Sequence, residues 1–341
     1  MKSSKRAPRR VPGRVPQRTE LKPVRVRATG PADLLALVPY LLGFRPTESL
    51  VLLLIRQGQV LLTARIDLPP EELQAAVTDQ FAALAGQHEA EGLVLVGFSE
   101  HDEATRSLLR AMVPQLGPHG LIDAVYADGR RWWSMTCTKA CCPVEGTRYD
   151  TSSSPLAAEA VYAGMASAPG RDAIEARVSG PAAAEVDLLS RQAKDAAREL
   201  GEWSERRRAR EMSSLVTAFV AGPRAMSDAE CARLAVLAAD VAVRDVAWAL
   251  IERADVDHHL DLWGQVVSRT VSPWEPAPLC LLGMAAWIAG NGALQNCCSE
   301  RARRIDPGYS LVSLLDEINQ RALSPSFWDV LGATLKSEII R

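Results

Sequence analysis

The segments of this 341-residue chain that have strand character all lie before residue 151, and this division constrains the fold most strongly. Apolar runs of strand length occupy residues 50–55, 60–68, 92–98, 121–126 and 130–136. Stretches with helical spacing lie between them, at 71–85 and 102–116, and a short helix from Pro31 to near Gly43 precedes them. Strands that alternate with helices in this order predict an α/β N-terminal domain with a mixed sheet.

The second half of the chain has the pattern of helices almost throughout. Residues 152–155 begin a helix, and short breaks fall at 222–223, 255–257 and 272–278. Residues 276–304 match part of the tetratricopeptide pattern, with 308–322 packed behind them. We therefore expect an all-α helical domain of some six to eight helices that contains a tetratricopeptide-like hairpin. The predicted organisation is a disordered basic arm (1–27), an α/β domain with a Trp/Cys-rich end (28–150) and a helical domain (151–341).

The N-terminal arm differs in charge from the rest of the chain. Residues 1–27 contain ten basic residues and one acidic residue. The whole chain contains 39 basic and 41 acidic residues, so 29 basic and 40 acidic residues lie after residue 27. The arm therefore carries +9 and the body −11. Such an arm binds nucleic acid, lies on an anionic membrane surface, folds back on its own body, or stays solvated without a partner. The predicted contacts with an anionic polymer are Arg9, Arg10, Arg14, Arg18, Arg25 and Arg27.

Several classes of protein are disfavoured by the sequence. No apolar run approaches the roughly 18 to 20 residues that cross a bilayer, and no signal-peptide pattern follows the basic start. The seven cysteines are too few for a disulfide scaffold, which favours reduced thiols and a cytoplasmic location. Motifs of common nucleotide sites, zinc proteases and esterases are absent, and no cofactor is predicted.

Polar residues near the predicted strand ends form a candidate ligand pocket in the α/β domain. Arg65 and Asp67 alternate with apolar residues, so both point to one face near the carboxyl end of their strand, where α/β sheets hold ligands. They bind a polar substrate or a metal, or they form a structural ion pair. Trp133 serves as a stacking platform or as core, since it and Trp132 face opposite ways on a strand. The candidate pocket residues are Arg45, Ser49, Arg65, Asp67 and Trp133, with Cys137 nearby.

Three further groups have nucleophilic or metal-binding side chains. Cys137, Cys141 and Cys142 form a weak zinc set, because one C-x-x-x-C-C run lacks the second pair of a zinc knuckle, and a redox thiol or buried structural cysteines are the other interpretations. Cys297 and Cys298 are adjacent on a helix, so at most one is expected to be buried. For the pair at 258–259, a helix cap or surface position is expected.

Several longer motifs together resemble a known family. They are LLALVPYLLGFRPTESL at 34–50, ARIDLP at 64–69, the stretch from Trp133 through Cys142 to Gly146, the stretch from Ala286 to Gly292, and DPGYSL at 306–311. With these segments the chain resembles the actinobacterial domain-of-unknown-function family 4192 over nearly everything after Arg27. The resemblance implies a cytosolic protein of actinobacteria and assigns no activity.

The leading functional hypothesis is a cytosolic binding or adaptor protein that associates with nucleic acid or a protein partner through its basic arm and helical domain. The alternative is an enzyme that acts on a small polar or nucleotide-like substrate in the pocket of the α/β domain. A structural zinc protein is the third hypothesis. No oligomeric state follows from the sequence.

Overall fold

The computed structural model describes residues 30–137, 139, 142–151 and 154–339. Seven of the residues singled out in the sequence lie outside this part of the chain: Arg9, Arg10, Arg14, Arg18, Arg25, Arg27 and Cys141. The described part consists of an α/β region followed by a mostly helical region, as the sequence predicts.

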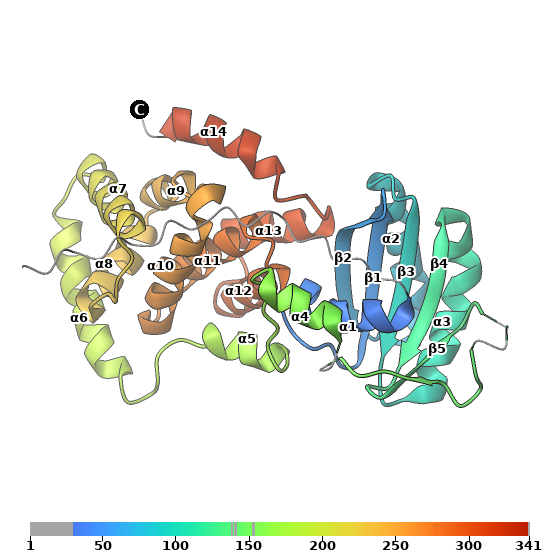
Figure 1. The fold of residues 1–341 in the computed structure, drawn as a ribbon. Helices are drawn as coiled ribbons and strands as arrows, with labels where there is room; N and C mark the ends of the chain where they lie inside the picture. Colours follow the sequence, from blue (N-terminus) through green and yellow to red (C-terminus); the bar gives the residue numbers. More distant parts are fainter. Residues whose placement is uncertain (1–29, 138, 140–141, 152–153, 340–341) are drawn as a thin grey trace, which may run out of the picture.

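A six-stranded mixed sheet forms the centre of the α/β region, with the strand order β2-β1-β3-β4-β5-β6. The strands are β1 (Ser49–Arg56), β2 (Gln59–Asp67), β3 (Gly92–Phe98), β4 (Leu121–Ala127), β5 (Arg131–Ser134) and β6 (Thr147–Arg148). β3 and β4 pair in parallel, and the other neighbouring strands are antiparallel. β3 is buried along its whole length because both of its faces are apolar and covered. β2 forms one edge of the sheet and is the strand nearest the helical region (Figure 1).

Helices cover both faces of this sheet. They are α1 (Pro31–Leu42), α2 (Gln74–Gln87) and α3 (Asp102–Leu116), with short 3-10 turns η1 (Glu71–Leu73) and η2 (Gly117–His119). Leu35 and Val38 of α1 pack on one face, against Val51 and its neighbours. Phe81 of α2 and Leu109 of α3 pack on the opposite face. The sheet therefore lies between two apolar cores.

Eleven α-helices follow in the described part of the chain. They are α4 (Pro155–Tyr162), α5 (Arg171–Arg177), α6 (Val186–Gly201), α7 (Glu205–Ala221), α8 (Asp228–Ala238), α9 (Val241–Ala249), α10 (Val256–Arg269), α11 (Pro276–Ile288), α12 (Gly292–Ile305), α13 (Ser310–Gln320) and α14 (Phe327–Ile339), with a 3-10 turn η3 (Arg253–Asp255). α4 packs on α1, whereas the later helices build a separate core. Within the described ranges, no helix is both long and apolar enough to cross a membrane.

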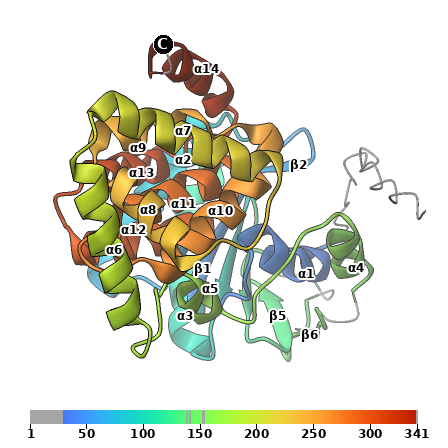
Figure 2. The same ribbon diagram turned by 90° about the vertical axis from the view of Figure 1, so that its left-hand side faces the viewer.

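α11 is the centre of the helical region. All thirteen of its residues are buried, and α10, α12 and α13 surround it (Figure 2). α11 and α12 form the predicted helical hairpin, with α13 packed on both. The expectation that at most one of Cys297 and Cys298 is buried is wrong, since their exposed fractions are 2% and 0%. α12 buries two faces because it packs on α11 and α13 on one side and on α5 on another.

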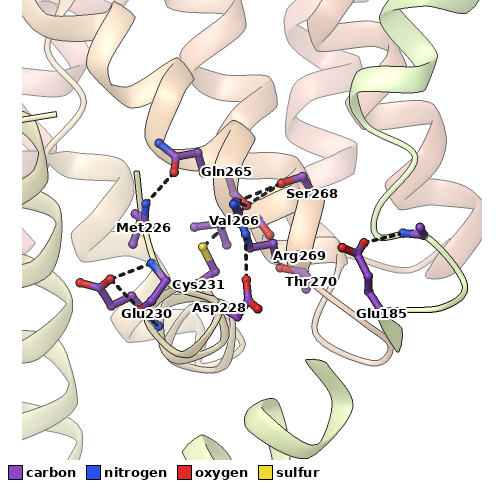
Figure 3. A network of polar contacts seen from close by, with 12 residues as sticks. Glu185, Met226, Asp228, Glu230, Cys231, Gln265, Val266, Ser268, Arg269 and Thr270 are labelled. Atoms are coloured by element: carbon purple, nitrogen blue, oxygen red, sulfur yellow. Dashed lines mark hydrogen bonds and ion pairs between the residues drawn. The ribbon is translucent and has the colours of Figure 1, made fainter. Parts of the chain in front are cut away.

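A polar network joins the start of α8 to the end of α10 (Figure 3). Arg269 donates to the Asp228 carboxylate over 3.0 Å and to the carbonyl of Gln265 over 3.2 Å. The side chain of Gln265 in turn accepts from the backbone amide of Met226 at 2.9 Å. A capping box is present as well, since Ser227 and Glu230 exchange hydrogen bonds at the first turn of α8.

Candidate functional site

A cleft of about 500 Å³ lies between the sheet edge and the helical region. Its lining comes from β2, the end of α1, α2, the α11–α12 hairpin and the end of α13. Segments more than 200 residues apart in the sequence therefore meet at one site. A concave site formed jointly by two structural units is a common place for ligands to bind.

β2 forms one wall of the cleft along most of its length. The seven consecutive residues 60–66 all line it. Since successive side chains of a strand point to opposite faces, such a run shows that the cleft follows the edge of the strand. The edge backbone of β2 is therefore part of the site.

Apolar side chains form most of the remaining surface. Phe81 and Leu84 of α2 contribute from one side of the sheet edge, and Leu42 and Phe44 from the end of α1 on the other. Ile318 of α13 and Trp287 of α11 face them from the helical region. Trp287 is held in place because its indole Nε1 donates to the carbonyl of Leu323 over 3.0 Å.

The loop after α1 connects the two walls. Gly43 ends α1 with a φ of 79°, a left-handed conformation that glycine adopts without strain. Its carbonyl accepts from the amide of Ala168 at 2.8 Å, and the amide of Arg45 donates to the carbonyl of Ala168 over 3.1 Å. Phe44 is only 4% exposed and belongs to the core of the helical region. This loop fixes the sheet edge relative to the helices.

Three residues of the predicted pocket come together at the carboxyl end of β2. Nε of Arg65 donates to the hydroxyl of the buried Ser49 over 2.8 Å, and its Nη2 lies 2.6 Å from the Asp67 carboxylate. The Arg65 side chain is 12% exposed and lines the cleft, whereas Asp67 is 80% exposed and does not. Arg45 is exposed on the neighbouring loop. The guanidinium of Arg65 is paired with the Asp67 carboxylate, so the charge that it presents to the cleft is neutralised.

The opposite wall has a similar arrangement around Arg171. Its Nε lies 3.2 Å from the Glu175 carboxylate within α5, and its guanidinium also pairs with Glu300 of α12. Nearby, Asn319 donates to the side-chain oxygen of Asn296 over 2.6 Å. The charges that line the cleft are therefore already balanced by acids of the protein.

Trp133 lies at a different surface. On β5 it pairs with Tyr126, whose ring it stacks at 5.2 Å, and the guanidinium of Arg106 on α3 lies 4.2 Å from its ring. Arg65 pairs with Val51, which faces α1, so Arg65 and Trp133 occupy opposite faces of the sheet. The structure therefore separates Trp133 from the other pocket residues. Trp132 points into the core under α1, as the alternation on a strand predicts.

The cysteine segment adjoins a second, smaller cavity of about 200 Å³ that Trp133 and Arg106 also line. Cys137 and Cys142 are partly buried there, and the third member of the predicted zinc set is the residue outside the described part. Among the described residues, no group of three or more His, Cys, Asp or Glu side chains is placed to hold a metal ion. The zinc set stays a prediction.

The helical wall of the cleft was not among the residues predicted from the sequence. Arg171 and Asn296 belong to no recognisable sequence motif, and Trp287 and Gly292 lie inside the segment that the sequence predicts to be a helical hairpin. One signal was nevertheless present. The stretches 34–50, 64–69 and 286–292, on which the family resemblance rests, all contribute to this cleft.

Comparison with known proteins gives one finding. The family described as "Domain of unknown function (DUF4192)" matches residues 31–326, most of the chain. No curated protein and no solved structure matches the chain.

Proposed function

The chain belongs to the family described as "Domain of unknown function (DUF4192)", and we propose that it is a binding protein whose ligand occupies the cleft between β2 and the helical region. The observation that carries this proposal is the composition of the cleft. Apolar side chains from both regions converge on a concave surface of about 500 Å³, and its two arginines are held by acids. Such a lining suits a ligand that is largely uncharged.

The same lining favours binding over the alternative of catalysis. Among the described lining residues there is no Asp, Glu, His, Cys, Ser, Tyr or Lys. General acid–base and nucleophilic catalysis draw mainly on these side chains. Arg65 is paired with Asp67, and Arg171 is paired with Glu300. These arginines are therefore suited to weak polar contacts with a ligand and not to proton transfer.

The binding protein is proposed to work in the cytoplasm. Four cysteines of the helical region, Cys231, Cys280, Cys297 and Cys298, are buried free thiols, which suits a reducing compartment. Burial raises the pKa of Cys280 to about 12, so this thiol stays protonated and unreactive at neutral pH.

The proposal is tested by blocking the cleft. Gly292 lines it, and a side chain added there meets no atom within 4 Å, so Gly292→Trp fills the cleft without a clash at its Cβ. Anilinonaphthalene sulfonate, a fluorescent probe with an apolar ring system and one sulfonate group, is expected to bind the wild type and to show much weaker fluorescence with this variant. Gly201→Trp is the matched control, because that helical glycine is exposed, equally free of contacts and absent from the cleft.

Two results would contradict the proposal. One is the absence of a fluorescence increase with the wild type, and the other is unchanged probe binding by Gly292→Trp. Circular dichroism of both variants shows whether each keeps its helix content.

A further inference from the structure

We propose that the ligand of the cleft is an extended peptide segment that pairs with β2 and becomes a seventh strand of the sheet. This inference rests on the proposed function, since it names the class of ligand for the same cleft. An edge strand is a template for such addition, because its outer N–H and C=O groups have no partner within the sheet.

The two edges of the sheet differ in how they are protected. At one edge the sheet ends in β5 and β6, which have only four and two residues. At the other, β2 has nine residues, the longest strand of the sheet, and contains neither Pro nor Lys. Short strands, Pro, Lys and β-bulges are among the means by which an edge is closed to further pairing. β2 is long and has neither Pro nor Lys, and its one register shift, at Leu54 and Ile55 of β1, lies outside the stretch from Thr63 to Ile66.

The register shows which backbone groups of β2 face the cleft. The amide of Leu68 donates to the carbonyl of Glu48, which makes that pair a hydrogen-bonded one. Since hydrogen-bonded and non-bonded pairs alternate in an antiparallel ladder, Ile66 and Ala64 also bond to β1. The N–H and C=O groups of Thr63 and Arg65 therefore point outward. No described residue forms a hydrogen bond with these outward groups.

The apolar face of β2 indicates which side chains a bound peptide carries. Leu50, Leu52 and Leu54 of β1 are fully buried under α2. Their partners on β2, which are Leu62, Ala64 and Ile66, share that face but remain partly exposed. A seventh strand with apolar side chains at alternate positions would cover them, as β2 covers β1.

The surroundings of the edge favour a single strand over a second copy of this chain. Trp287, Asn296 and Ile318 of the helical region line the same cleft as β2. The helical region lies beside this edge of the sheet (Figure 1), so a whole sheet of another molecule cannot approach β2 in the plane of the strands. The seven lining residues of β2 span about 23 Å at about 3.3 Å per residue, the length of a peptide of similar size. The length of the cleft along β2 therefore matches that of a single extended segment.

The experiment uses the full chain and a displayed library of random linear twelve-residue peptides. Selection is expected to return peptides with apolar residues at alternate positions, and their dissociation constants are then measured by calorimetry. Thr63→Pro removes one outward N–H from an edge strand, where proline is tolerated, and is expected to weaken binding about tenfold. Thr63→Val keeps the N–H and replaces the hydroxyl by a methyl group, so any change that it causes measures the side chain alone, and Thr63→Pro is expected to weaken binding further.

A second measurement does not depend on how a variant folds. Synthetic forms of a selected peptide are methylated on the backbone nitrogens of either its odd or its even residues. One set of residues pairs with β2 and the other faces away, so one methylated form is expected to lose binding and the other to keep it. Equal loss, or no loss, in both forms would overturn the proposal, as would a library that returns no binder.

The outcomes separate this inference from the proposed function. If anilinonaphthalene sulfonate binds in a manner sensitive to Gly292→Trp but no peptide binds, the cleft is a site for a small molecule and the seventh strand is refuted. If light scattering shows dimers that Thr63→Pro dissociates, the edge pairs with a second copy and the single-strand proposal is again refuted. If the probe does not bind the cleft, the proposed function itself fails.

Discussion

The guanidinium of Arg65 joins a buried hydroxyl to an exposed carboxylate. Ser49 is 0% exposed, so its oxygen depends on the protein for a donor, whereas 80% of the Asp67 side chain is exposed to water. Removing a donor from a buried acceptor costs more than removing an exposed ionic partner. The two partners of Arg65 should therefore differ in their effect on stability.

We predict that Arg65→Met lowers the free energy of unfolding by about 1–3 kcal/mol, because the Ser49 hydroxyl loses its donor. Asp67→Asn should cost no more than about 1 kcal/mol, the range of exposed ion pairs. Urea unfolding at neutral pH measures both values. Equal losses would show that the ion pair, and not the hydroxyl, is the main partner of Arg65.

His259 is buried completely, contrary to the expected cap or surface position. Its Nε2 lies 3.6 Å from the Asp255 carboxylate, and the backbone of Leu250 adjoins the ring. The sequence could not indicate this, because the adjacent His258 is exposed and the two differ only in which face of α10 they occupy.

Burial lowers the pKa of His259 below its ordinary value of 6.5, against the opposing pull of Asp255. The unfolded chain therefore takes up the proton more readily, so stability is highest above about pH 6.5 and decreases as the pH falls below it. We predict that His259→Gln reduces this loss between pH 7.5 and pH 5.5, measured by urea unfolding. His258→Gln, one residue away and exposed, should leave the loss unchanged.

Among the elements, α8 has the clearest local signal. The hydroxyl of Ser227 accepts from the amide of Glu230, and Glu230 reaches back to the amide of Ser227. Hydrogen bonds from Arg224 and Ser227 hold the pKa of Glu230 at about 2, so this carboxylate is ionised throughout the neutral range. The S-x-x-E spacing at 227–230 is the sequence pattern typical of such a cap.

We predict that Ser227→Ala destabilises the protein by about 1 kcal/mol, the usual value of an N-cap. Ser204 precedes α7 in the same extended conformation but makes no capping hydrogen bond, so Ser204→Ala should cost less. Thermal unfolding of the two variants side by side tests the difference. If Ser204→Ala destabilised the protein as much as Ser227→Ala, the loss of stability would come from the backbone preference of serine and not from the capping hydrogen bond.

Trp328 is a buried anchor of α14. The indole of Trp328 donates to the carbonyl of Ile251 over 2.8 Å and stacks on Trp248 at 5.5 Å. We predict that Trp328→Ala detaches α14, so that backbone amides of 328–337 exchange at least about tenfold faster. The adjacent Phe327 is 50% exposed, and Phe327→Ala should leave exchange in α14 nearly unchanged.

Other element boundaries were less predictable. The first five strands and the order of helices between them follow from apolar periodicity, whereas the two residues of β6 are too few to show any. The helical region has eleven helices in the described part, more than the six to eight expected. The break between α8 and α9 contains no Gly or Pro, and Asp240 caps α9 there by accepting from the amide of Ala242.

In the whole molecule, only part of the cleft lining could be predicted from the sequence. Alternation on one strand placed Arg65 and Asp67 together, because that inference needs only local geometry. Trp133 lies on the opposite face of the sheet from Arg65, because its position is set by the pairing of β5 with β4. Arg171 and Trp287 reach the cleft only through the packing of α5 and α11, which no local pattern specifies.

The charge of the arm leads to a prediction about the full chain. Residues 1–27 carry +9, so wild-type protein should bind generic duplex DNA with an affinity that falls steeply with salt. A chain that lacks these residues should lose this binding, because the remaining body carries −11. Fluorescence anisotropy between 50 and about 200 mM salt measures it. Binding that survives removal of the arm would place the contact on the acidic body instead.

The ligand is proposed to bind the chain at the open edge of β2. Residue-resolved hydrogen exchange of the wild-type protein, with and without a selected peptide, tests it most directly. We predict that the outward amides of Thr63 and Arg65 become protected when the peptide binds, while those of Ala64 and Ile66, already bonded to β1, change little. Saturated peptide binding without protection of Thr63 and Arg65 would contradict the account.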